Sequence, residues 1–584
     1  LKGDYLKGNL LFVFQENLAN NFMIWKQRKL EPKENEVDQL IKSLSVQYEI
    51  AYLLIQRGIS DFDSAKNYFR PSIDKLHDPL IMLDMVKAVK RIEKAIQNQE
   101  KIMILGDYDV DGITAVTLVY SYLKNYLPII YYLPDRYLEG YGVSKKSIDL
   151  AKKEEVNLII SLDCGINAIE NVSYAKKNKI DFIVCDHHIP GEILPDAIAI
   201  LNPKQKECNY PFKELSGCGI GFKLVHALEK QKGGGIKDLK IFFDLVTMSI
   251  AADVVPLINE NRIIAYHGLK QIKEKPRQGI KIFLKDIKGE VNISHIVFTL
   301  APRINASGRM KHAKHSVELL LSEDKSEAIS RGRLIEMLNT ERRILDKQTT
   351  IQAIEQIKKN GEEKSYTSVV YDSNWNKGII GIVASRMIET YNRPTVVFTS
   401  SGDYLTGSVR SIKGLDIYSI LQSCQKHIIR FGGHKYAAGL TIMEESFLKF
   451  KSAFELAVKE IVVANDSMPT RYYDQEITFD KITPKFYRII VQMSPFGEGN
   501  PEPVFKTSNC IDSGGTRIVG KLNDHLKLEL IDGSGNHFKG IGFKMAEHYE
   551  KIKTLNPFNI FYNVSINEFF GEKELQLKIK GIQF

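Results

Sequence analysis

One stretch of this 584-residue chain indicates the fold class most directly: Lys101-Ile102-Met103-Ile104-Leu105-Gly106-Asp107-Tyr108-Asp109-Val110-Asp111-Gly112. Its apolar part has the length of a strand, and a segment with helical periodicity, 114–124, follows the carboxylates. Further short apolar runs alternate with amphipathic segments, at 129–133, 158–162, 182–185 and 198–201. Because such runs between amphipathic helices are typical of buried parallel strands in β-α-β units, we expect an α/β fold in which residues 100–205 form an open, doubly wound sheet.

The acidic residues after these strands predict a metal site. Three carboxylates within five residues repel one another unless cations neutralise them. The carboxyl ends of parallel strands meet at one edge of the sheet, and this edge also receives the residues that follow 158–162 and 182–185. A further acid stands alone in an apolar stretch. The full set is Asp107, Asp109, Asp111, Asp163, Asp186, His187, His188 and Asp253.

Each of these residues has an ordinary structural explanation by itself, such as a helix cap or a packing contact. Together they require compensating positive charge. A mixed carboxylate and imidazole set without thiolates suits Mn²⁺ or Mg²⁺ better than a structural zinc. The chemistry that we expect is a two-metal centre that activates water and stabilises an oxygen displaced from phosphorus.

Two motif matches are rejected. D-x-D-x-D-G also begins a calcium-binding EF-hand loop, but the twelfth position is Leu118 instead of Glu, and a strand rather than a helix precedes it. The stretch Gly217-Cys218-Gly219-Ile220-Gly221 precedes a helix, but it lacks both the G-x-G-x-x-G spacing and the expected strand. We therefore do not interpret it as a phosphate loop.

Composition sets broad limits on the protein class. Hydrophobic residues make up 43% and charged residues 26%, as in an ordinary globular protein, and the net charge of +9 is compatible with an anionic partner. No apolar run approaches the roughly 18 residues that a membrane span needs, so no membrane association is expected. Six scattered cysteines without a C-x-x-C pair favour a reducing cytoplasm over a disulfide scaffold or a zinc ribbon.

Changes in sequence pattern divide the chain into six predicted parts. Residues 1–22, before Met23, are interpreted as a tail added by upstream translation or by cloning. A long helical segment with almost no Gly or Pro is predicted to connect two α/β bodies, and strand-like stretches separated by Gly, Asn and Asp turns predict a C-terminal β-barrel. The parts are 1–22, an N-terminal helical region 23–98, the first α/β domain 99–316, the connector helix 317–360, a smaller α/β domain 361–463 and the barrel 464–584.

The motifs resemble a known family. Asp-His-His after a strand, with D-x-D-x-D-G upstream, resembles the DHH phosphoesterase superfamily. The segments 134–142, 301–310 and 432–440 narrow the resemblance to the RecJ family of bacterial single-strand-specific 5′→3′ DNA exonucleases, from about Trp25 to the C-terminus. The chain departs from many relatives at Asn376, where they have His, which leaves the role of this position open.

The resemblance implies a set of roles. Asp107, Asp109, Asp111, Asp163, His187, His188 and Asp253 would bind two Mn²⁺ or Mg²⁺ ions, with Asp186 either a ligand or a support. Residues 361–463 would form a DHHA1 domain that holds substrate over the metals, and 464–584 an OB-fold that binds single-stranded DNA. Aromatic and basic candidates in the OB-fold are Tyr472, Tyr473, Phe496, Phe505, Lys506, Arg517 and Lys521. The implied substrate contacts are Arg136, Arg303, Asn305, Ser307, Arg309, Ser408, Arg410, Gly432, Gly433 and His434.

The same resemblance implies work in DNA repair and recombination, with a single-strand-binding protein and recombination helicases as candidate partners. Two other functions compete with the exonuclease. One is a DHH phosphodiesterase for short oligonucleotides or cyclic dinucleotides, but such relatives are shorter and lack the barrel. The other is a non-catalytic binding protein that has lost its acidic residues, and here every expected carboxylate is present.

Overall fold

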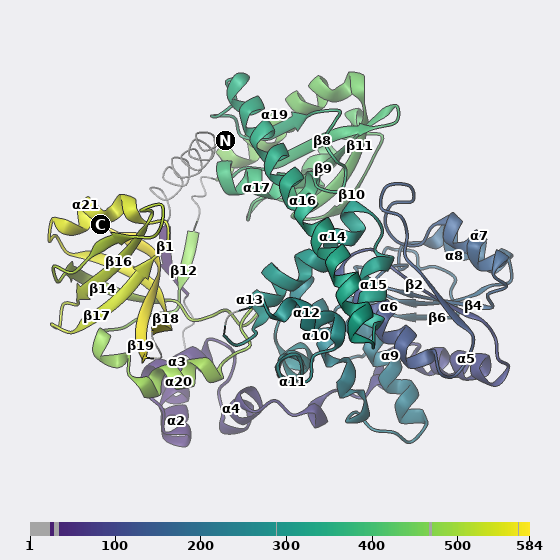
Figure 1. The fold of residues 1–584 in the computed structure, drawn as a ribbon, viewed down its shortest axis with the longest axis horizontal. Coiled ribbons are helices and arrows are strands. Elements are labelled where there is room, and N and C mark those ends of the chain that lie inside the picture. The colour runs from purple at the N-terminus through teal and green to yellow at the C-terminus, as the bar shows by residue number, and fades with distance from the viewer. Residues whose placement is uncertain (1–23, 29–33, 288, 466–469, 570–571) are drawn as a thin grey trace. The chain divides into compact units, whose positions relative to one another are not determined.

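The structure, a computed structural model, describes residues 24–28, 34–287, 289–465, 470–569 and 572–584, which fall into two compact units (Figure 1). The large unit contains residues 72–466 and 497–499. The small unit contains the described residues before 72, together with 467–496 and 500–584. The predicted tail, 1–22, lies outside the described residues.

A five-stranded parallel sheet forms the first body of the large unit, in the order β3-β2-β4-β5-β6. Alternate residues of β2 face two different cores. Ile102 and Ile104 pack with helices α5, α6 and α9, whereas Met103 and Leu105 pack with α7 and α8. Helices therefore cover both faces (Figure 1), which confirms the predicted doubly wound sheet. The bounds are β2 (Ile102–Gly106), β3 (Ile129–Tyr132), β4 (Leu158–Leu162), β5 (Asp181–Cys185), β6 (Ala199–Leu201), α5 (Met85–Gln97), α6 (Val110–Leu123), α7 (Lys145–Lys153), α8 (Ile169–Lys177) and α9 (Gly217–Gln231).

Further helices complete the first body and lead to the connector. They are α10 (Phe243–Ala252), α11 (Asn259–Glu274), α12 (Gln278–Leu284), α13 (Ile293–His295), α14 (Ala301–Met310), α15 (Lys314–Leu321) and α16 (Lys325–Lys359). The connector predicted at 317–360 is thus two helices. The first helix ends at Leu321, and Asp324 caps the start of α16 by accepting a hydrogen bond from Glu327 N at 2.8 Å. This N-cap was hidden by the helical periodicity on both sides of it.

The second body of the large unit has a mixed sheet in the order β10-β11-β9-β8-β7, in which only β7 and β8 are parallel. Its elements are β7 (Ser368–Tyr371), α17 (Ile380–Tyr391), β8 (Thr395–Ser401), β9 (Tyr404–Arg410), α18 (Ile417–Ser423), β10 (Arg430–His434), β11 (Ala437–Met443) and α19 (Phe447–Asn465). Helix α16 joins the bodies, since Ile335 packs in the core of the first and Ile357 in that of the second.

The small unit contains a seven-stranded sheet in the order β13-β14-β18-β19-β17-β16-β15, and an additional pairing between β14 and β16 closes it into a barrel. Its elements are β12 (Thr470–Tyr473), β13 (Gln475–Glu476), α20 (Pro484–Gln492), β14 (Phe505–Asp512), β15 (Arg517–Val519), β16 (His525–Ile531), β17 (His537–Gly542), α21 (Tyr549–Lys553), β18 (Phe558–Phe569) and β19 (Glu572–Gln583).

The predicted helical region 23–98 is divided between the two units. Residues Ile24–Gln27 form strand β1, which pairs in parallel with β12, and Trp25 stacks on Phe561 with ring centroids 4.1 Å apart. Helices α2 (Glu34–Leu44), α3 (Tyr48–Ile55) and α4 (Phe62–Phe69) share the barrel core, whereas α5 packs on the parallel sheet. The boundary after residue 71 depends on a strand partner more than 400 residues away in the chain, about which local periodicity carries no information.

The described residues contain no helix long and apolar enough to span a lipid bilayer. All six cysteines are buried and unpaired.

Candidate functional site

The carboxyl ends of β2, β4 and β5 bring the predicted acids and imidazoles together. Asp107, Asp163 and Asp186 each follow one of these strands directly. His187 Nε2 lies 3.2 Å from Asp163 Oδ1, 3.6 Å from Asp253 Oδ2 and 3.8 Å from Asp111 Oδ2. Two sets offer ligand atoms that all lie within 4.8 Å of one another: Asp163, His187 and His188 in one, and Asp111, His187 and Asp253 in the other.

Backbone and hydroxyl donors hold Asp111 in place. Its Oδ1 accepts hydrogen bonds from Cys218 N at 2.6 Å and Ser249 Oγ at 2.7 Å, and its Oδ2 accepts from Gly217 N at 2.7 Å. A Cβ on Gly217 would lie 2.5 Å from Asp163 Cβ, so only glycine allows this approach. The glycine-rich stretch therefore presents the N-terminus of α9 to a carboxylate of the site.

Gly217 and Ser249 were missed from the sequence. The available signal is the run of glycines at the start of a predicted helix, which does not match a phosphate-loop pattern. Ser249 had no signal, because it lies within an apolar helix.

Three other aspartates differ in the hydrogen-bond partners of their carboxylate oxygens. Asp109 Oδ1 accepts from Asp111 N at 3.0 Å and caps α6. Asp186 accepts from Ile166 N at 2.9 Å with Oδ2, and its Oδ1 lies 2.7 Å from His188 Nδ1. Asp186 thus orients His188, which favours support over direct ligation. Asp107 is fully buried, and its Oδ2 has no hydrogen-bond partner among the described residues.

The site carries uncompensated negative charge. Burial, with Asp109 beside it, raises the pKa of Asp107 well above its usual range, and burial together with Asp111 does the same for Asp163. The Asp253 side chain is 34% exposed, yet partial burial and the charge of Asp111 raise its pKa to about 8. Burial lowers the pKa of His187.

A divalent cation fits these residues. It would neutralise the carboxylates and give a partner to Asp107 Oδ2, a buried atom that has none among the described residues. The donors are oxygens and imidazole nitrogens, the set that suits Mn²⁺ or Mg²⁺.

Three arginines form a cationic cluster, Arg136, Arg309 and Arg410, contributed by both bodies. Burial lowers the pKa of Arg309 to about 9, with Arg136 and Arg410 adding to the effect, and burial followed by Arg136 lowers the pKa of Arg410. In the described part of the chain, no carboxylate oxygen lies within 4.0 Å of their nitrogens. Because a guanidinium keeps its proton at ordinary pH, this excess charge favours binding of an anion such as phosphate.

The cluster is held by backbone acceptors and one aromatic ring. Arg136 Cζ lies 3.7 Å from the centroid of the Tyr108 ring, and its Nε donates to Gly308 O at 3.2 Å. Arg410 Nη1 donates to Ser408 Oγ at 3.2 Å.

Three of the predicted substrate contacts in the motif 301–310 have partners within the protein. Arg303 donates to Glu336 Oε2 at 2.7 Å and to Asp286 Oδ2 at 3.0 Å. Ser307 is buried and hydrogen bonds Ser316. Asn305 Oδ1 accepts from Val110 N at 3.0 Å, so it supports the carboxylate loop.

Strand β10 brings the second body to His188, one of the predicted metal ligands. The His434 ring stacks on that of His188, with centroids 5.9 Å apart and 10° between the planes. Gly433 has φ +150°, and a Cβ there would overlap Ala437 O, so the strand requires glycine beside His434. The structure thus places Gly432, Gly433 and His434 at the edge of the site.

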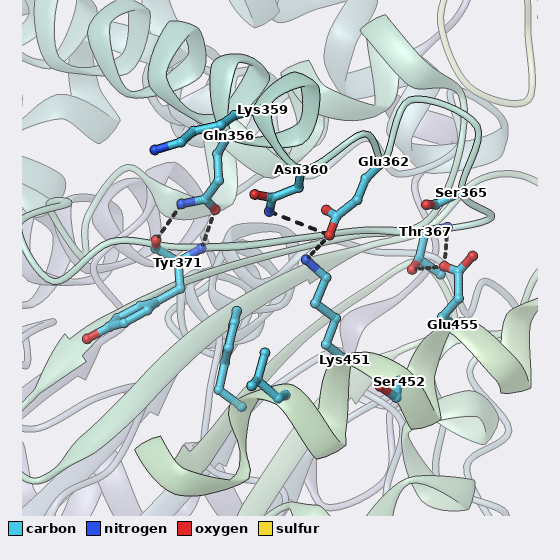
Figure 2. A pocket seen from close by; sticks show the side chains of 12 residues that line it. Gln356, Lys359, Asn360, Glu362, Ser365, Thr367, Tyr371, Lys451, Ser452 and Glu455 are labelled. Atoms are coloured by element: carbon cyan, nitrogen blue, oxygen red, sulfur yellow. Dashed lines mark hydrogen bonds and ion pairs between the residues drawn. The ribbon is translucent and has the colours of Figure 1, made fainter.

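A cavity of about 750 Å³ in the second body lies apart from this chemistry (Figure 2). Several of its polar side chains are paired within the protein. Gln356 exchanges hydrogen bonds with the backbone of Tyr371, and Lys451 lies 2.6 Å from Glu362.

The barrel candidates divide into buried and exposed residues. Phe505 lies in the barrel core, and Tyr473 packs on Phe561. Lys506 pairs with Glu476 at 3.0 Å. Tyr472 is 41% exposed.

Comparison with known proteins places each of these parts. Residues 101–250 match the N-terminal domain of the DHH family, 363–460 the DHHA1 domain, and 473–581 the RecJ OB domain. The single-stranded-DNA-specific exonuclease RecJ of Bacillus subtilis is 36% identical over 565 residues, which cover 96% of this chain and 70% of the relative.

Two solved structures are similar. RecJ of Thermus thermophilus in complex with Mn²⁺ has a TM-score of 0.83 at 24% identity and covers 97% of this chain and 80% of that one. A manganese-bound exonuclease RecJ has a TM-score of 0.59 at 28% identity and covers 68% of this chain and 98% of that one.

Proposed function

The chain belongs to the RecJ family of single-stranded-DNA-specific exonucleases, and on this premise we propose that it hydrolyses single-stranded DNA from the 5′ end toward the 3′ end. The observation that carries the proposal is the carboxylate and imidazole set at the ends of β2, β4 and β5, with a buried cluster of arginines contributed by both bodies. A phosphodiesterase needs both features, since one serves the reacting phosphate and the other holds a neighbouring phosphate.

Two divalent cations, Mn²⁺ or Mg²⁺, would be held by Asp107, Asp109, Asp111, Asp163, His187, His188 and Asp253. When bound, such a pair activates water and stabilises the oxygen displaced from phosphorus. Asp186 orients His188 through their 2.7 Å contact. The amides of Gly217 and Cys218 hold the Asp111 carboxylate in position.

Arg136, Arg309 and Arg410 would hold the terminal phosphate, and His434 would close the second body over the reacting group. Their support is the excess positive charge of the cluster and the stacking of His434 on His188. The barrel would hold the rest of the strand, with Tyr472 as an exposed stacking surface. We assign the protein to DNA repair and recombination in the cytoplasm, with a single-strand-binding protein and helicases as partners.

The test is digestion of 5′- and 3′-labelled single strands with Mn²⁺ or Mg²⁺, beside a duplex and a dinucleotide. We expect the 5′ label to be released first, the duplex to resist and the dinucleotide to be a poor substrate. Preferential cleavage of the dinucleotide would instead identify a phosphodiesterase for short substrates. Release of the 3′ label first would contradict the proposed polarity.

Two variants of proposed metal ligands test the metal assignment. Asp163→Asn and His187→Ala should each lower hydrolysis by more than roughly the hundredfold that loss of a merely supporting group costs, while strand binding persists. Near-normal turnover of the folded Asp163→Asn variant at saturating Mn²⁺ would refute the assignment.

A further inference from the structure

Tyr137 of the first body connects two arginines of the cationic cluster to the second body. It follows Arg136 in the chain, and its hydroxyl donates to Arg309 O or to Asn376 Oδ1, the latter at 3.0 Å. A phenol has one proton, so the two acceptors share it. Burial raises the pKa of Tyr137, which keeps that proton in place.

Asn376 accepts hydrogen bonds from both bodies, from Tyr137 in the first and from Gly378 in the second. Its Oδ1 accepts from Gly378 N at 2.8 Å as well as from Tyr137, which assigns the oxygen and leaves no role for a flipped amide. Gly378 O in turn accepts from Arg309 Nη1 at 3.0 Å. Lys377 Nζ also donates to Tyr137 O at 3.4 Å.

Gly378 has no room for a side chain. A Cβ there would overlap Arg309 O and lie 2.6 Å from Tyr137 Oη. Gly378 precedes α17, whose Gly381 lies close to the third arginine, because a Cβ on Gly381 would meet Arg410 Nη2 at 3.0 Å. The loop 374–378 therefore contacts Arg309 directly and reaches Arg410 through the start of α17.

The same contacts continue to the carboxylates. Gly308, next to Arg309, accepts from Arg136 Nε, and a Cβ on Gly308 would lie 2.5 Å from Tyr108 O. Tyr108 stands between Asp107 and Asp109 in the metal loop. The C-terminal end of α14 is thus packed against the metal loop on one side and against the loop 374–378 on the other.

We propose that Tyr137, Asn376 and Gly378, the Tyr137 node, are positioning residues that set the spacing between the arginine cluster and the metal ligands. The node acts through the backbone of Arg309 and touches neither the metals nor the scissile phosphate. It determines how well a strand whose terminal phosphate is bound at the arginines presents its next phosphodiester to the carboxylates. This inference rests on the proposed exonuclease function.

The experiment compares 5′-phosphorylated and 5′-hydroxyl strands of one sequence with the full chain. Wild type should prefer the phosphorylated strand. Tyr137→Phe and Asn376→Ala should each reduce this preference roughly tenfold, the equivalent of one hydrogen bond, mainly through KM. The preference of the double variant should fall no further than that of the more strongly affected single variant, because both substitutions break the same set of contacts. The matched controls are Tyr404→Phe, at an exposed tyrosine, and Gly235→Ala, whose Cβ would meet nothing closer than Asp238 Oδ2 at 3.9 Å.

The outcomes separate the two proposals. If wild type cleaves neither strand, the proposed function fails. If wild type cleaves both strands equally, the arginine cluster does not bind the terminal phosphate, and the node has no phosphate to position. If wild type prefers the phosphorylated strand and the node variants keep that preference while only their Tm falls, the residues are merely structural and this inference is overturned. Mn²⁺ titration of each variant should give the wild-type affinity, and a loss of it would also contradict the positioning role.

Discussion

The carboxylates at the strand ends differ in what holds them, and this difference sets their roles. Asp111 accepts three hydrogen bonds from α9 and α10, and Asp186 is occupied by His188 and Ile166. Asp107 and Asp163 are buried with raised pKa values and little to offset their charge. Asp111 and Asp186 therefore have hydrogen-bond donors from the protein, whereas Asp107 and Asp163 depend on a cation to offset their charge.

Ser249 provides a test of this support. Ser249→Ala removes the 2.7 Å hydrogen bond to Asp111 while leaving the carboxylate in place. We expect Mn²⁺ affinity to fall roughly tenfold to a hundredfold, as is usual when a group that orients a ligand is lost. Calorimetric titration measures the affinity, and Ser423→Ala, on α18 of the second body, is the control. An unchanged affinity would show that the two backbone amides suffice.

Asp253 makes the stability of the metal-free protein depend on pH. Its pKa is 3.8 without perturbation and about 8 in the fold, so the folded state binds a proton that the unfolded chain has released. The free energy of unfolding should therefore fall as pH rises between these values. Asp253→Asn should lessen this decline in melting curves recorded in EDTA. Mn²⁺ should raise Tm more at about pH 8 than at about pH 5, because protons compete with the cation. Equal slopes in wild type and variant would contradict the assignment.

Among the elements, helix α9 has the tightest contact with the site. Its first residue, Gly217, lies against Asp163, which directly follows β4. A Cβ added to Gly217 would lie 2.5 Å from Asp163 Cβ. The helix and the strand can approach this closely only because glycine lacks a side chain. This approach brings the amides of the helix N-terminus to Asp111.

Gly217→Ala should separate α9 from Asp163. We expect a loss of about 1–3 kcal/mol in the free energy of unfolding, as for other overpacked sites, together with weaker Mn²⁺ binding. Chemical denaturation and metal titration measure the two effects. Gly235→Ala, whose Cβ would meet nothing closer than Asp238 Oδ2 at 3.9 Å, should change neither. Wild-type metal affinity in the folded Gly217→Ala variant would contradict this account of the site.

At the scale of the whole molecule, the large unit contains every proposed metal ligand and every arginine of the cluster. The small unit contains the barrel together with β1 and α2–α4. Removal of residues 464–584 alone would expose the core side chains of α3, such as Leu53 and Leu54. A clean separation must therefore remove residues 1–71 as well.

A fragment of residues 72–463 tests the role of the barrel. Because stacking contributes about 1–3 kcal/mol per base, affinity for long strands should fall by orders of magnitude, and its dependence on salt should flatten. Cleavage of oligonucleotides only a few residues long should change much less. A salt titration of binding and turnover on short and long strands measures this, with circular dichroism as the check on folding. Tight binding with an unchanged salt slope would show that the barrel is not a nucleic-acid module.

The sequence by itself determined the doubly wound sheet, the acids at its strand ends and the order of the bodies, because burial periodicity and strand-end chemistry are local properties. Only the tertiary structure decided which partner each side chain has. Arg303 and Arg309 stand in the same motif, yet one pairs with Glu336 and the other lies beside Arg136 and Arg410. Trp25 packs on Phe561, and Asp111 accepts hydrogen bonds from backbone amides of α9. Such pairings join residues far apart in the chain, and their energies depend on distances that no local pattern contains.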